Sequence, residues 1–325
     1  MDALTTSAAA NEPRLKVAVL IPCLNEAGGI AAVVAGFRAA LPDATIYVYD
    51  NASTDDTSGA AARAGAQVRH EPMRGKGNVV RRMFADVEAD VYILVDGDGT
   101  YDAPSAPKMI ELLCDQHLDM ICGKRIDTAQ EAYRQGHRLG NRVLTGLVAN
   151  LFGDSVTDIL SGYRVMSRRF VKSFPALSKG FEIETELTVH ALDLRVPIAE
   201  VATPYGARAQ GTASKLNTWR DGWRILKTIG RLVKEERPFA FFFTGGALLA
   251  LLSIGLATPV VIEFLRTGLV ERIPTAVLST GIMLVAVMSF VCGLILDTVT
   301  RGRRELKRMH YLLHGNQVAG RSRRS

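Results

Sequence analysis

Two aspartates separated by one glycine follow an apolar run, and their type and spacing suit metal-assisted chemistry. Asp96-Gly97-Asp98 comes directly after residues 91–95, which read Val-Tyr-Ile-Leu-Val. A strand that ends in two carboxylates can hold a hard divalent cation, because such ions take oxygen ligands and leave coordination positions for substrate phosphates. The pattern predicts a nucleotide-diphosphate site, although Asp, Gly and Thr also form ordinary turns after strands.

The elements that would position this pair alternate along the first half of the chain. Strand-like runs occupy residues 16–21, 45–49, 66–68, 91–95 and 120–122, and helix-like runs occupy 30–41, 54–64, 78–86 and 107–116. This alternation predicts an α/β fold with a largely parallel sheet, whose ligands bind beyond the carboxyl ends of the strands. Polar motifs stand at those ends: residues 22–26 follow the first strand and residues 50–53 the second. Neither a dinucleotide-binding Gly-x-Gly-x-x-Gly nor a P-loop is present.

Two long apolar segments follow the α/β part. Residues 239–262 and 273–296 contain no Asp, Glu, Lys or Arg. A helix of this length, rising about 1.5 Å per residue, reaches about 36 Å and exceeds a hydrocarbon core of about 30 Å. We expect two membrane-spanning helices, with a pair of buried core helices as the alternative.

The net charge of +6 is concentrated beside these segments. Residues 1–218 hold 23 Lys plus Arg and at least as many Asp plus Glu. This part of the chain therefore has no excess positive charge of the kind that binds nucleic acid. Basic residues are in clear excess in two segments, residues 219–237 and the tail after Leu296. In the connector 263–272, positive and negative charges are equal in number. The positive-inside bias therefore predicts that both termini are cytoplasmic, at a cell membrane crossed twice.

These observations predict five segments. They are a flexible N-terminus (1–14), a catalytic domain (15–217), an amphipathic juxtamembrane helix (218–237), two transmembrane helices (238–297) and a basic cytoplasmic tail (298–325). Trp219 and Trp223 recur at helical spacing among basic residues, a pattern that suits a helix at the membrane interface. The same pattern would also fit a solvated helix that packs against the catalytic domain. No cleavable signal peptide is expected. The four cysteines lack metal-ligand spacing and are expected to be reduced packing residues.

Taken together, the motifs resemble those of the inverting glycosyltransferases of family 2 with the GT-A fold, and among them the polyprenyl-phosphate glycosyltransferases typified by dolichol-phosphate mannose synthase. The resemblance covers about residues 17–216. Its carriers are residues 21–26, 50–55, 75–78, 96–98, 123–125, 158 with 161–164, and 208 with 211–215.

The resemblance implies roles for individual residues. Nucleotide-sugar binding falls to Pro22, Asn25, Glu26, Asp50, Lys76, Asp96, Gly97, Arg208, Ser214 and Lys215. Metal binding, of Mg²⁺ or Mn²⁺, falls to Asp96 and Asp98, with Thr100 where the family often has Gln and Asp102 as a stand-in. Acceptor-phosphate binding falls to Arg125, Arg138, Arg142, Ser161 and Arg164, and the catalytic set comprises Asp98, Asp158, Arg125 and Arg164. Arg138 and Arg142 would also fit as exposed helix charges.

The expected reaction is transfer of one sugar from a nucleotide sugar to a polyprenyl phosphate at the cytoplasmic face. A lipid monophosphate has a second pKa of about 6, so it is already largely dianionic and needs cations to hold it rather than a strong base. Direct displacement would invert the anomeric carbon. A UDP-sugar is favoured over GDP-mannose, and the chain could associate laterally into a homo-oligomer. The alternatives are a processive polysaccharide synthase, although its Gln-x-x-Arg-Trp motif is absent, and a non-catalytic nucleotide-sugar-binding membrane partner.

Overall fold

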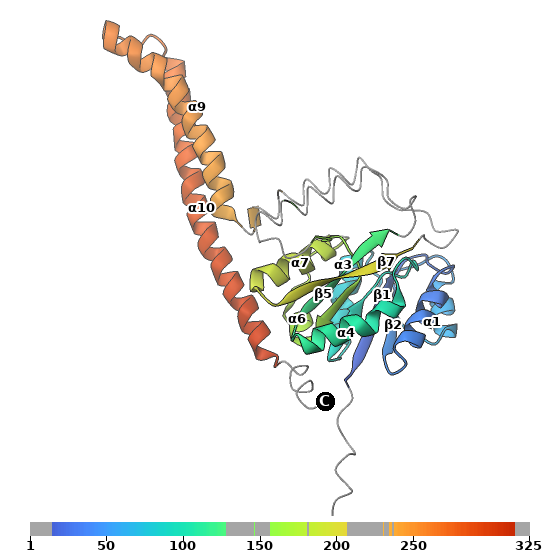
Figure 1. Cartoon of the computed structure of the whole chain (residues 1–325). Coiled ribbons are helices and arrows are strands. Elements are labelled where there is room, and N and C mark those ends of the chain that lie inside the picture. The colour runs from blue at the N-terminus through green and yellow to red at the C-terminus, as the bar shows by residue number, and fades with distance from the viewer. Residues whose placement is uncertain are drawn as a thin grey trace, which may run out of the picture. The chain divides into compact units, whose positions relative to one another are not determined.

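The computed structural model describes residues 15–127, 146, 157–180, 182–206, 230, 234–235 and 237–315. The chain divides into two compact units (Figure 1). One comprises Met1–Thr218 with Lys307–Ser325, and the other is Trp219–Leu306.

The first unit is built on a seven-stranded sheet with the order β3-β2-β1-β4-β6-β5-β7. The strands are β1 (Val17–Cys23), β2 (Thr45–Asp50), β3 (Gln67–His70), β4 (Val91–Leu94), β5 (Met120–Asp127), β6 (Arg164–Ser167) and β7 (Ile198–Tyr205). β1 pairs in parallel with β2 and β4, β2 with β3, and β5 with β7, whereas β6 runs antiparallel to both of its neighbours. The predicted largely parallel α/β sheet is confirmed.

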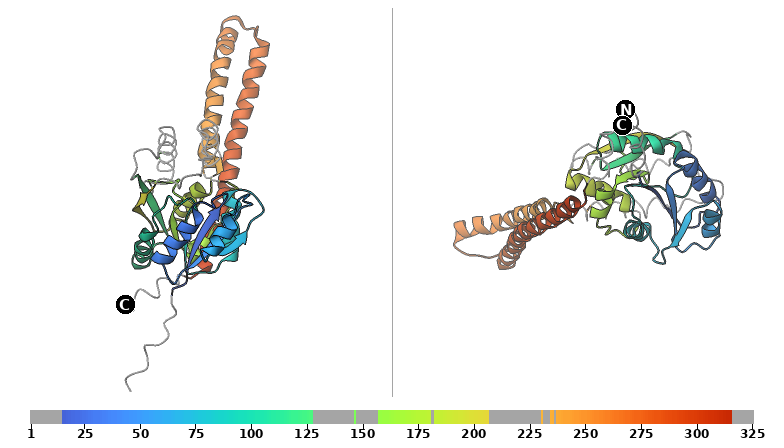
Figure 2. Two further views of the ribbon diagram at one scale, coloured as in Figure 1. Left: turned by 90° about the vertical axis from the view of Figure 1, so that its right-hand side faces the viewer. Right: turned by 90° about the horizontal axis from the view of Figure 1, so that it is seen from below.

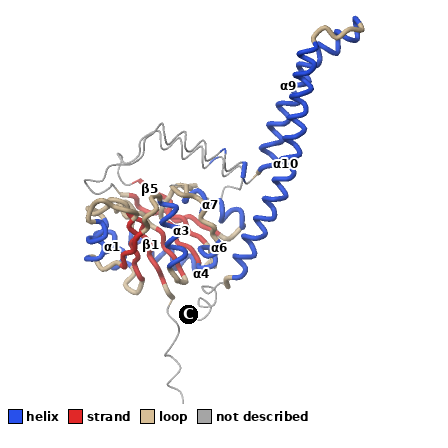
Figure 3. Tube along the Cα trace, turned by 180° about the vertical axis from the view of Figure 1, so that it is seen from behind, coloured by secondary structure: helices blue, strands red, loops and turns tan. Residues whose placement is uncertain are grey.

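Helices cover both faces of this sheet, as Figures 2 and 3 show from three further directions. They are α1 (Ile30–Ala40), α2 (Thr57–Arg63), α3 (Lys76–Asp86), α4 (Ala106–Asp115), α6 (Arg168–Ser173) and α7 (Ile183–Leu194), with the 3-10 turn η1 (Ala103–Ser105) before α4. Alternate residues of β1 point to opposite faces, as the period of a strand requires. Val19 and Ile21 join a core with α1, α2 and α4, and Ala18 and Leu20 join a second core with α3, α6 and α7.

This topology gathers the polar motifs at one edge. β1, β2 and β4 are parallel neighbours, so their carboxyl ends meet at the same edge of the sheet. Backbone hydrogen bonds tie these ends together: Asn51 N–H donates to Cys23 O at 2.8 Å, and Val95 N–H to Leu20 O at 3.1 Å. Ligands of α/β sheets bind beyond such an edge.

The strand β6 was not anticipated by the sequence alternation. Its residues are completely buried, and Ile93 of β4 and Ile121 of β5 both pair with Val165. β6 therefore lies between two strands that point the other way. A four-residue strand with an arginine at its start does not show the apolar alternation from which strands are predicted.

The second unit contains two long apolar helices that form a hairpin, α9 (Pro238–Thr267) and the first part of α10 (Ile273–Leu313). Both are long and apolar enough to cross a membrane. Their contacting residues recur every seventh position: Gly246, Ser253 and Val260 on α9 and Ser279, Ala286, Gly293 and Thr300 on α10 are buried. Small side chains at such spacing let two apolar helices approach closely. Ser253 Oγ completes the contact by donating to Ser279 O at 2.7 Å.

The helices differ from the expected spans mainly at the end of α10. It continues 17 residues past Leu296, to Leu313, through part of the predicted tail. An ion pair of 2.9 Å between Arg301 and Asp297, one turn apart, supports this extension. Most of the predicted juxtamembrane helix 218–237 lies outside the described residues.

Candidate active site

The loop after β4 carries the carboxylate pair. Its central residue must be the glycine Gly97, because the sulfur of Cys23 lies too close for a side chain. A Cβ atom added to Gly97 would lie 2.5 Å from Cys23 Sγ at the end of β1. Any larger residue would push the loop away from the sheet edge. Burial beside the acidic groups raises the pKa of the Cys23 thiol well above its usual value, so it stays a protonated packing group.

Asp98 is almost fully buried and is oriented by Thr100. It is 4% exposed, and Asp98 Oδ1 accepts from Thr100 Oγ1 at 2.6 Å and from Thr100 N at 3.2 Å. Thr100, predicted as a metal ligand, thus acts on Asp98 in this structure. Asp102, the possible stand-in, accepts from Ser105 Oγ at 2.6 Å, at the start of η1 and α4.

Lys76 joins three separate elements at the same edge. It begins α3, and Lys76 Nζ donates to both Asp96 Oδ1 and Glu184 Oε1, the latter on α7. Burial alone would lower the pKa of Lys76, but the two carboxylates outweigh it and raise that pKa. Burial raises the pKa of Glu184, and the charge of Asp96 adds to this effect while Lys76 opposes it. Lys76 thus holds Asp96, one of the predicted metal ligands, at the sheet edge that also carries Asp98.

The second oxygen of Glu184 has no hydrogen-bond partner among the residues that the structure describes. Glu184 Oε2 is buried, and the described residues offer it no hydrogen-bond partner. A buried unpaired carboxylate oxygen is costly in a site built for the protein alone. From the sequence, one of the glutamates at 182, 184 and 186 could orient a sugar hydroxyl or accept from an arginine, but an exposed helix edge explains their alternation equally well.

Hydrogen bonds connect the loop after β1 to the loop after β2 and fix their conformations. Asp50 accepts from Ser53 N at 2.9 Å and from Ser58 Oγ at 2.6 Å. Burial would raise the pKa of Asp50, but these hydrogen bonds outweigh burial and lower it, so the residue is ionised. Asn25, at a left-handed φ of 54°, accepts from Thr54 N at 2.7 Å.

Asn51 connects the loop after β2 to the segment that precedes α3. Its side-chain amide donates to Glu71 O and Met73 O at 2.9 and 2.8 Å, and Asn51 Oδ1 accepts from Gly75 N at 2.7 Å. Asn51 stands within the motif at residues 50–55, which by itself indicates no individual role for it. Pro22 and Glu26 lie at the same edge; Glu26 N–H donates to Thr57 Oγ1 at 2.9 Å.

Arg125 and Asp158 form a bidentate pair at the end of β5. Arg125 Nε donates to Asp158 Oδ2 and its terminal nitrogen to Asp158 Oδ1, both at 2.8 Å. Burial would raise the pKa of Asp158, but the guanidinium outweighs burial and lowers it. The guanidinium carbon of Arg125 also lies 5.5 Å from the centre of the Tyr205 ring. The pair is thus a preformed unit within the site region.

Glu200 on β7 positions this pair. Its carboxylate accepts from Thr157 N, Thr157 Oγ1 and Asp158 N at 2.7, 2.7 and 2.9 Å. Nothing in the sequence identifies Glu200, because it stands alone in an extended segment and its partners are distant along the chain.

Arg164 and Ser161 lie inside the protein rather than at a lipid-facing surface. Arg164 is 0% exposed and donates to Ile159 O at 2.8 Å and Ser161 O at 3.2 Å. Ser161 Oγ donates to Gly123 O at 2.5 Å. This placement does not fit the expected direct contact with an acceptor phosphate. The two residues instead shape the loop whose Gly162 packs against Asp96, where an added Cβ would lie 2.5 Å from Asp96 Oδ2.

Five predicted site residues lie outside the described residues: Arg138, Arg142, Arg208, Ser214 and Lys215.

The donor set at this edge fits a hard divalent cation. The described residues contain no cluster of three His, Cys, Asp or Glu side chains suited to a metal. Magnesium-like ions in nucleotide sites need less, because one or two carboxylates suffice when substrate phosphates complete the coordination. Asp98 and Asp96 supply such oxygens on a loop that packs through Gly97 against Cys23 of β1.

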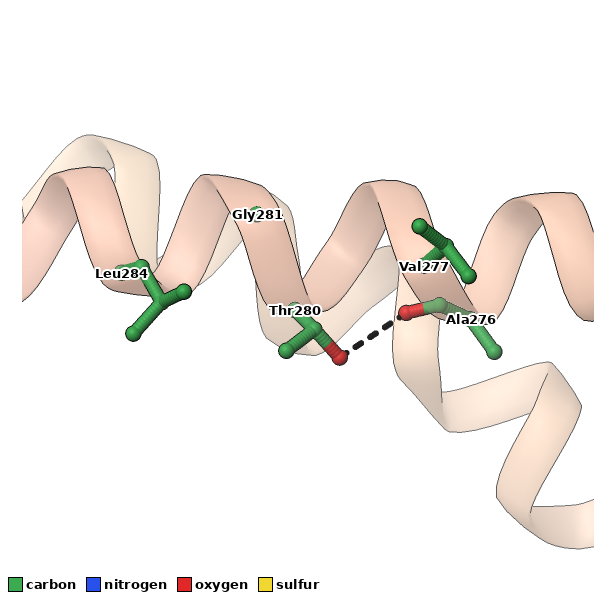
Figure 4. Close-up of a pocket in the computed structure, with 5 residues that line it drawn as sticks. All are labelled: Ala276, Val277, Thr280, Gly281 and Leu284. Atoms are coloured by element: carbon green, nitrogen blue, oxygen red, sulfur yellow. Dashed lines mark hydrogen bonds between the residues drawn. The ribbon is translucent and has the colours of Figure 1, made fainter.

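A surface depression elsewhere in the chain has different chemistry. Figure 4 shows it on α10, lined by Ala276, Val277, Thr280, Gly281 and Leu284. The Thr280 hydroxyl donates to Ala276 O within the helix at 2.9 Å. The depression therefore presents an apolar wall and is not a site for nucleotide chemistry.

Comparison with known proteins agrees with this geometry. Residues 18–174 match the model of glycosyl transferase family 2. The chain is 33% identical over 298 residues to glycosyltransferase AglJ of Haloferax volcanii, covering 91% of this chain and 98% of that protein. It is 28% identical over 221 residues to a dolichyl-phosphate hexose transferase of the same organism, covering 68% and 95%.

A solved structure shares the fold. Glucosyl-3-phosphoglycerate synthase from Mycobacterium tuberculosis, in complex with Mn²⁺, UDP and glucosyl-3-phosphoglycerate, aligns with a TM-score of 0.55 and 25% identity. The alignment covers 68% of this chain and 79% of that one. The sheet, the carboxylate loop at its edge and these similarities give a GT-A fold, and the chain is an enzyme that belongs to glycosyltransferase family 2.

Proposed function

We propose that the protein transfers a single sugar, with inversion, from a nucleotide sugar to a polyprenyl phosphate at the cytoplasmic face of a membrane crossed by α9 and α10. The observation that carries the proposal is the meeting of Asp96, Asp98 and Lys76 at one sheet edge, in a chain that also has two long apolar helices. The first part suits a nucleotide diphosphate, and the second suits an acceptor that resides in a bilayer.

The donor side is supported by chemistry and by relatives. Asp96 and Asp98 would hold Mg²⁺ or Mn²⁺, which when bound neutralises charge on the departing diphosphate. Lys76 is fixed beside them, and the Asp50 loop would face the base and ribose. A UDP-sugar is favoured because the similar synthase binds UDP with Mn²⁺.

The acceptor side is supported by a relative named dolichyl-phosphate hexose transferase. A lipid phosphate dianion can form the new bond to the anomeric carbon while the bond to the diphosphate oxygen breaks, and no proton has to be removed. Its binding requires cations. Arg125, whose orientation is fixed by Asp158 and Glu200, would bind this phosphate, with Arg138 and Arg142 as further candidates. We assign Arg164 to positioning the loop around Ser161.

The test uses purified full-length protein in nanodiscs with a short-chain polyprenyl phosphate and Mn²⁺. Labelled UDP-glucose, UDP-galactose, UDP-N-acetylglucosamine and GDP-mannose are supplied one at a time, and products are identified by mass spectrometry. We expect one monosaccharide-linked lipid, with a UDP-sugar as the best donor. Asp98→Ala should abolish transfer, whereas Asp115→Ala, at an exposed position of α4, should not.

Other products would redirect the proposal. Product formed only from GDP-mannose would assign the mannosyl donor, and a polymer would indicate a processive synthase. Nucleotide-sugar binding without turnover on any acceptor would favour a non-catalytic partner. Retained α-configuration, read by NMR coupling constants, would contradict direct displacement.

A further inference from the structure

Three large apolar side chains are exposed at the edge of the sheet that carries the site. Met73, Ile126 and Leu177 are 56%, 50% and 65% exposed. Across the described residues from 15 to 206, no other large hydrophobic side chain is exposed to a comparable degree. Single exposed apolar residues are ordinary on protein surfaces. Their shared location is not, and we call these three residues the apolar rim.

Contacts place Met73 and Leu177 around the start of α3. Met73 O accepts from Asn51 Nδ2 at 2.8 Å, immediately beyond β3. Leu177 N donates to Glu186 Oε1 at 2.8 Å, and the next two residues pack so closely on the α3 start that any Cβ at Gly75 or Gly77 would collide with their backbone. Met73 and Leu177 therefore both lie in segments that adjoin the start of α3, where Lys76 stands.

Ile126 occupies the corresponding position on the other side of the site. It lies near the carboxyl end of β5, in register with Pro204 of β7. β5 runs in the same direction as β4, because both are antiparallel to β6. All three members of the apolar rim thus lie at or near the sheet edge that carries Asp96 and Asp98.

Each member has an exposed cation within two positions along the chain. Arg74 follows Met73, Lys124 precedes Ile126 and Lys179 follows Leu177, and all three cations are exposed. Exposed acids of the same edge stand on the loop after β2, where Asp56 pairs with Arg63 at 2.6 Å and Asp55 accepts from Thr57 Oγ1 and Ala27 N. Apolar side chains interleaved with cations are the composition that binds the headgroup region of an anionic bilayer.

We propose that the apolar rim, with Arg74, Lys124 and Lys179, docks the site edge onto an anionic lipid surface. This inference rests on the proposed function, since it supplies the contact through which a lipid phosphate reaches the site. A bilayer is the occupant because the same chain carries α9 and α10, whose long apolar faces are exposed and suited to lipid. The catalytic unit is therefore tethered where such a surface is always within reach.

The experiment reads contact with lipid directly. The chain has two tryptophans, so Trp219→Phe with Trp223→Phe gives a tryptophan-free full-length background. A single tryptophan is then introduced as Met73→Trp or Leu177→Trp, with Gln67→Trp as the matched control at the exposed opposite end of β3. Each variant is placed in nanodiscs containing phosphatidylglycerol and a lipid brominated high on its acyl chain. Wild-type melting behaviour shows that each variant folds, and having two rim positions protects the test against failure of one.

We expect quenching at positions 73 and 177 to exceed that at position 67 severalfold. Arg74→Glu with Lys179→Glu should reduce quenching by removing a favourable contribution of about fivefold in surface binding per cation. Equal quenching at 67 and 73 would overturn the proposal, as would quenching unaffected by charge reversal. A blue-shifted emission at position 73 without bromine quenching would indicate a protein partner, such as a second copy, and would also reject it.

The quenching measurement needs neither the nucleotide-sugar donor nor the lipid-phosphate acceptor of the transfer reaction. A protein that proves to use another acceptor would still show rim quenching, whereas normal sugar transfer without quenching would reject the rim alone. The two proposals therefore fail separately.

Discussion

The carboxylate of Glu200 accepts the backbone N–H of Asp158 at 2.9 Å, and Asp158 in turn holds Arg125 through two hydrogen bonds of 2.8 Å. Glu200 belongs to β7 and Arg125 to β5, which are paired in parallel. The last strand of the sheet thus fixes the Arg125 guanidinium, both through Glu200 and through the ring of Tyr205, which lies 5.5 Å from it.

Glu200→Ala should disturb catalysis through position rather than binding of the donor. Loss of the carboxylate leaves the N–H of the buried Asp158 without its acceptor, a cost of about 1–3 kcal/mol, whereas the N–H of the exposed Thr157 can bind water instead. We expect kcat for lipid transfer to fall about tenfold, KM for the nucleotide sugar to change little, and Glu200→Gln to retain part of the activity. Steady-state kinetics check this, with Glu111→Gln on the exposed face of α4 as the control. A rise in donor KM alone would place Glu200 on the donor side instead.

The Lys76 arrangement predicts strong coupling between two residues 108 positions apart. Lys76→Met leaves Asp96 and the buried Glu184 without their shared ammonium, and an uncompensated buried charge costs about 3–5 kcal/mol. Glu184→Gln removes one of the two carboxylates and should cost less. The double variant should be less destabilised than the sum of the single changes. Thermal unfolding in detergent across this double-mutant cycle measures the coupling, and additive effects would show that the contact contributes nothing to folding.

The parts of the fold that the sequence predicts are those with local signals. Buried parallel strands appear as apolar runs, and the motif residues directly after β1, β2 and β4 share an edge because parallel topology forces them to. The two apolar helices follow from length and composition alone. β6 could not be predicted, because its four residues gain their stability from strands that are distant in sequence and run in the opposite direction.

The same distinction separates the site residues. Asp96, Asp98, Lys76 and Asp50 stand in short motifs at strand or helix ends, so their gathering could be expected. Glu184 and Glu200 have no motif of their own, and their roles depend on which side chains the fold brings to them. Arg164 shows the converse: its motif suggests a phosphate ligand, but a position on a central strand turns the guanidinium toward backbone carbonyls.

Thr100→Val should weaken metal activation more than it weakens catalysis. The hydroxyl of Thr100 donates to Asp98 Oδ1 at 2.6 Å, and groups that orient a metal ligand typically contribute 10- to 100-fold in metal affinity. We expect the Mn²⁺ concentration for half-maximal activity to rise about tenfold, with activity largely restored at saturating Mn²⁺ and preserved in Thr100→Ser. A metal titration of transfer rates measures this. Unchanged metal dependence in Thr100→Val would show that Asp98 does not need this partner.

His190 should make the stability of the first unit depend on pH. The ring is 2% exposed, packed between Phe170 and Phe174, with Ser173 Oγ 3.1 Å from Nε2. Burial, aided by the positive charge of Lys307, lowers the pKa of His190 to about 3.

The unfolded chain takes up this proton near pH 6.5, whereas the folded chain does not, so stability is complete above about pH 7.5 and declines as the pH falls. Between pH 7.5 and 5.5 the loss attributable to His190 is about 1.4 kcal/mol, or a fall in Tm of about 3–6 °C. His190→Gln lowers stability at every pH because it disturbs a packed position. It should nevertheless remove the part of the pH dependence of stability that comes from His190. Thermal unfolding of wild type and variant at matched pH values isolates the difference, and parallel curves would mean that His190 titrates alike in both states.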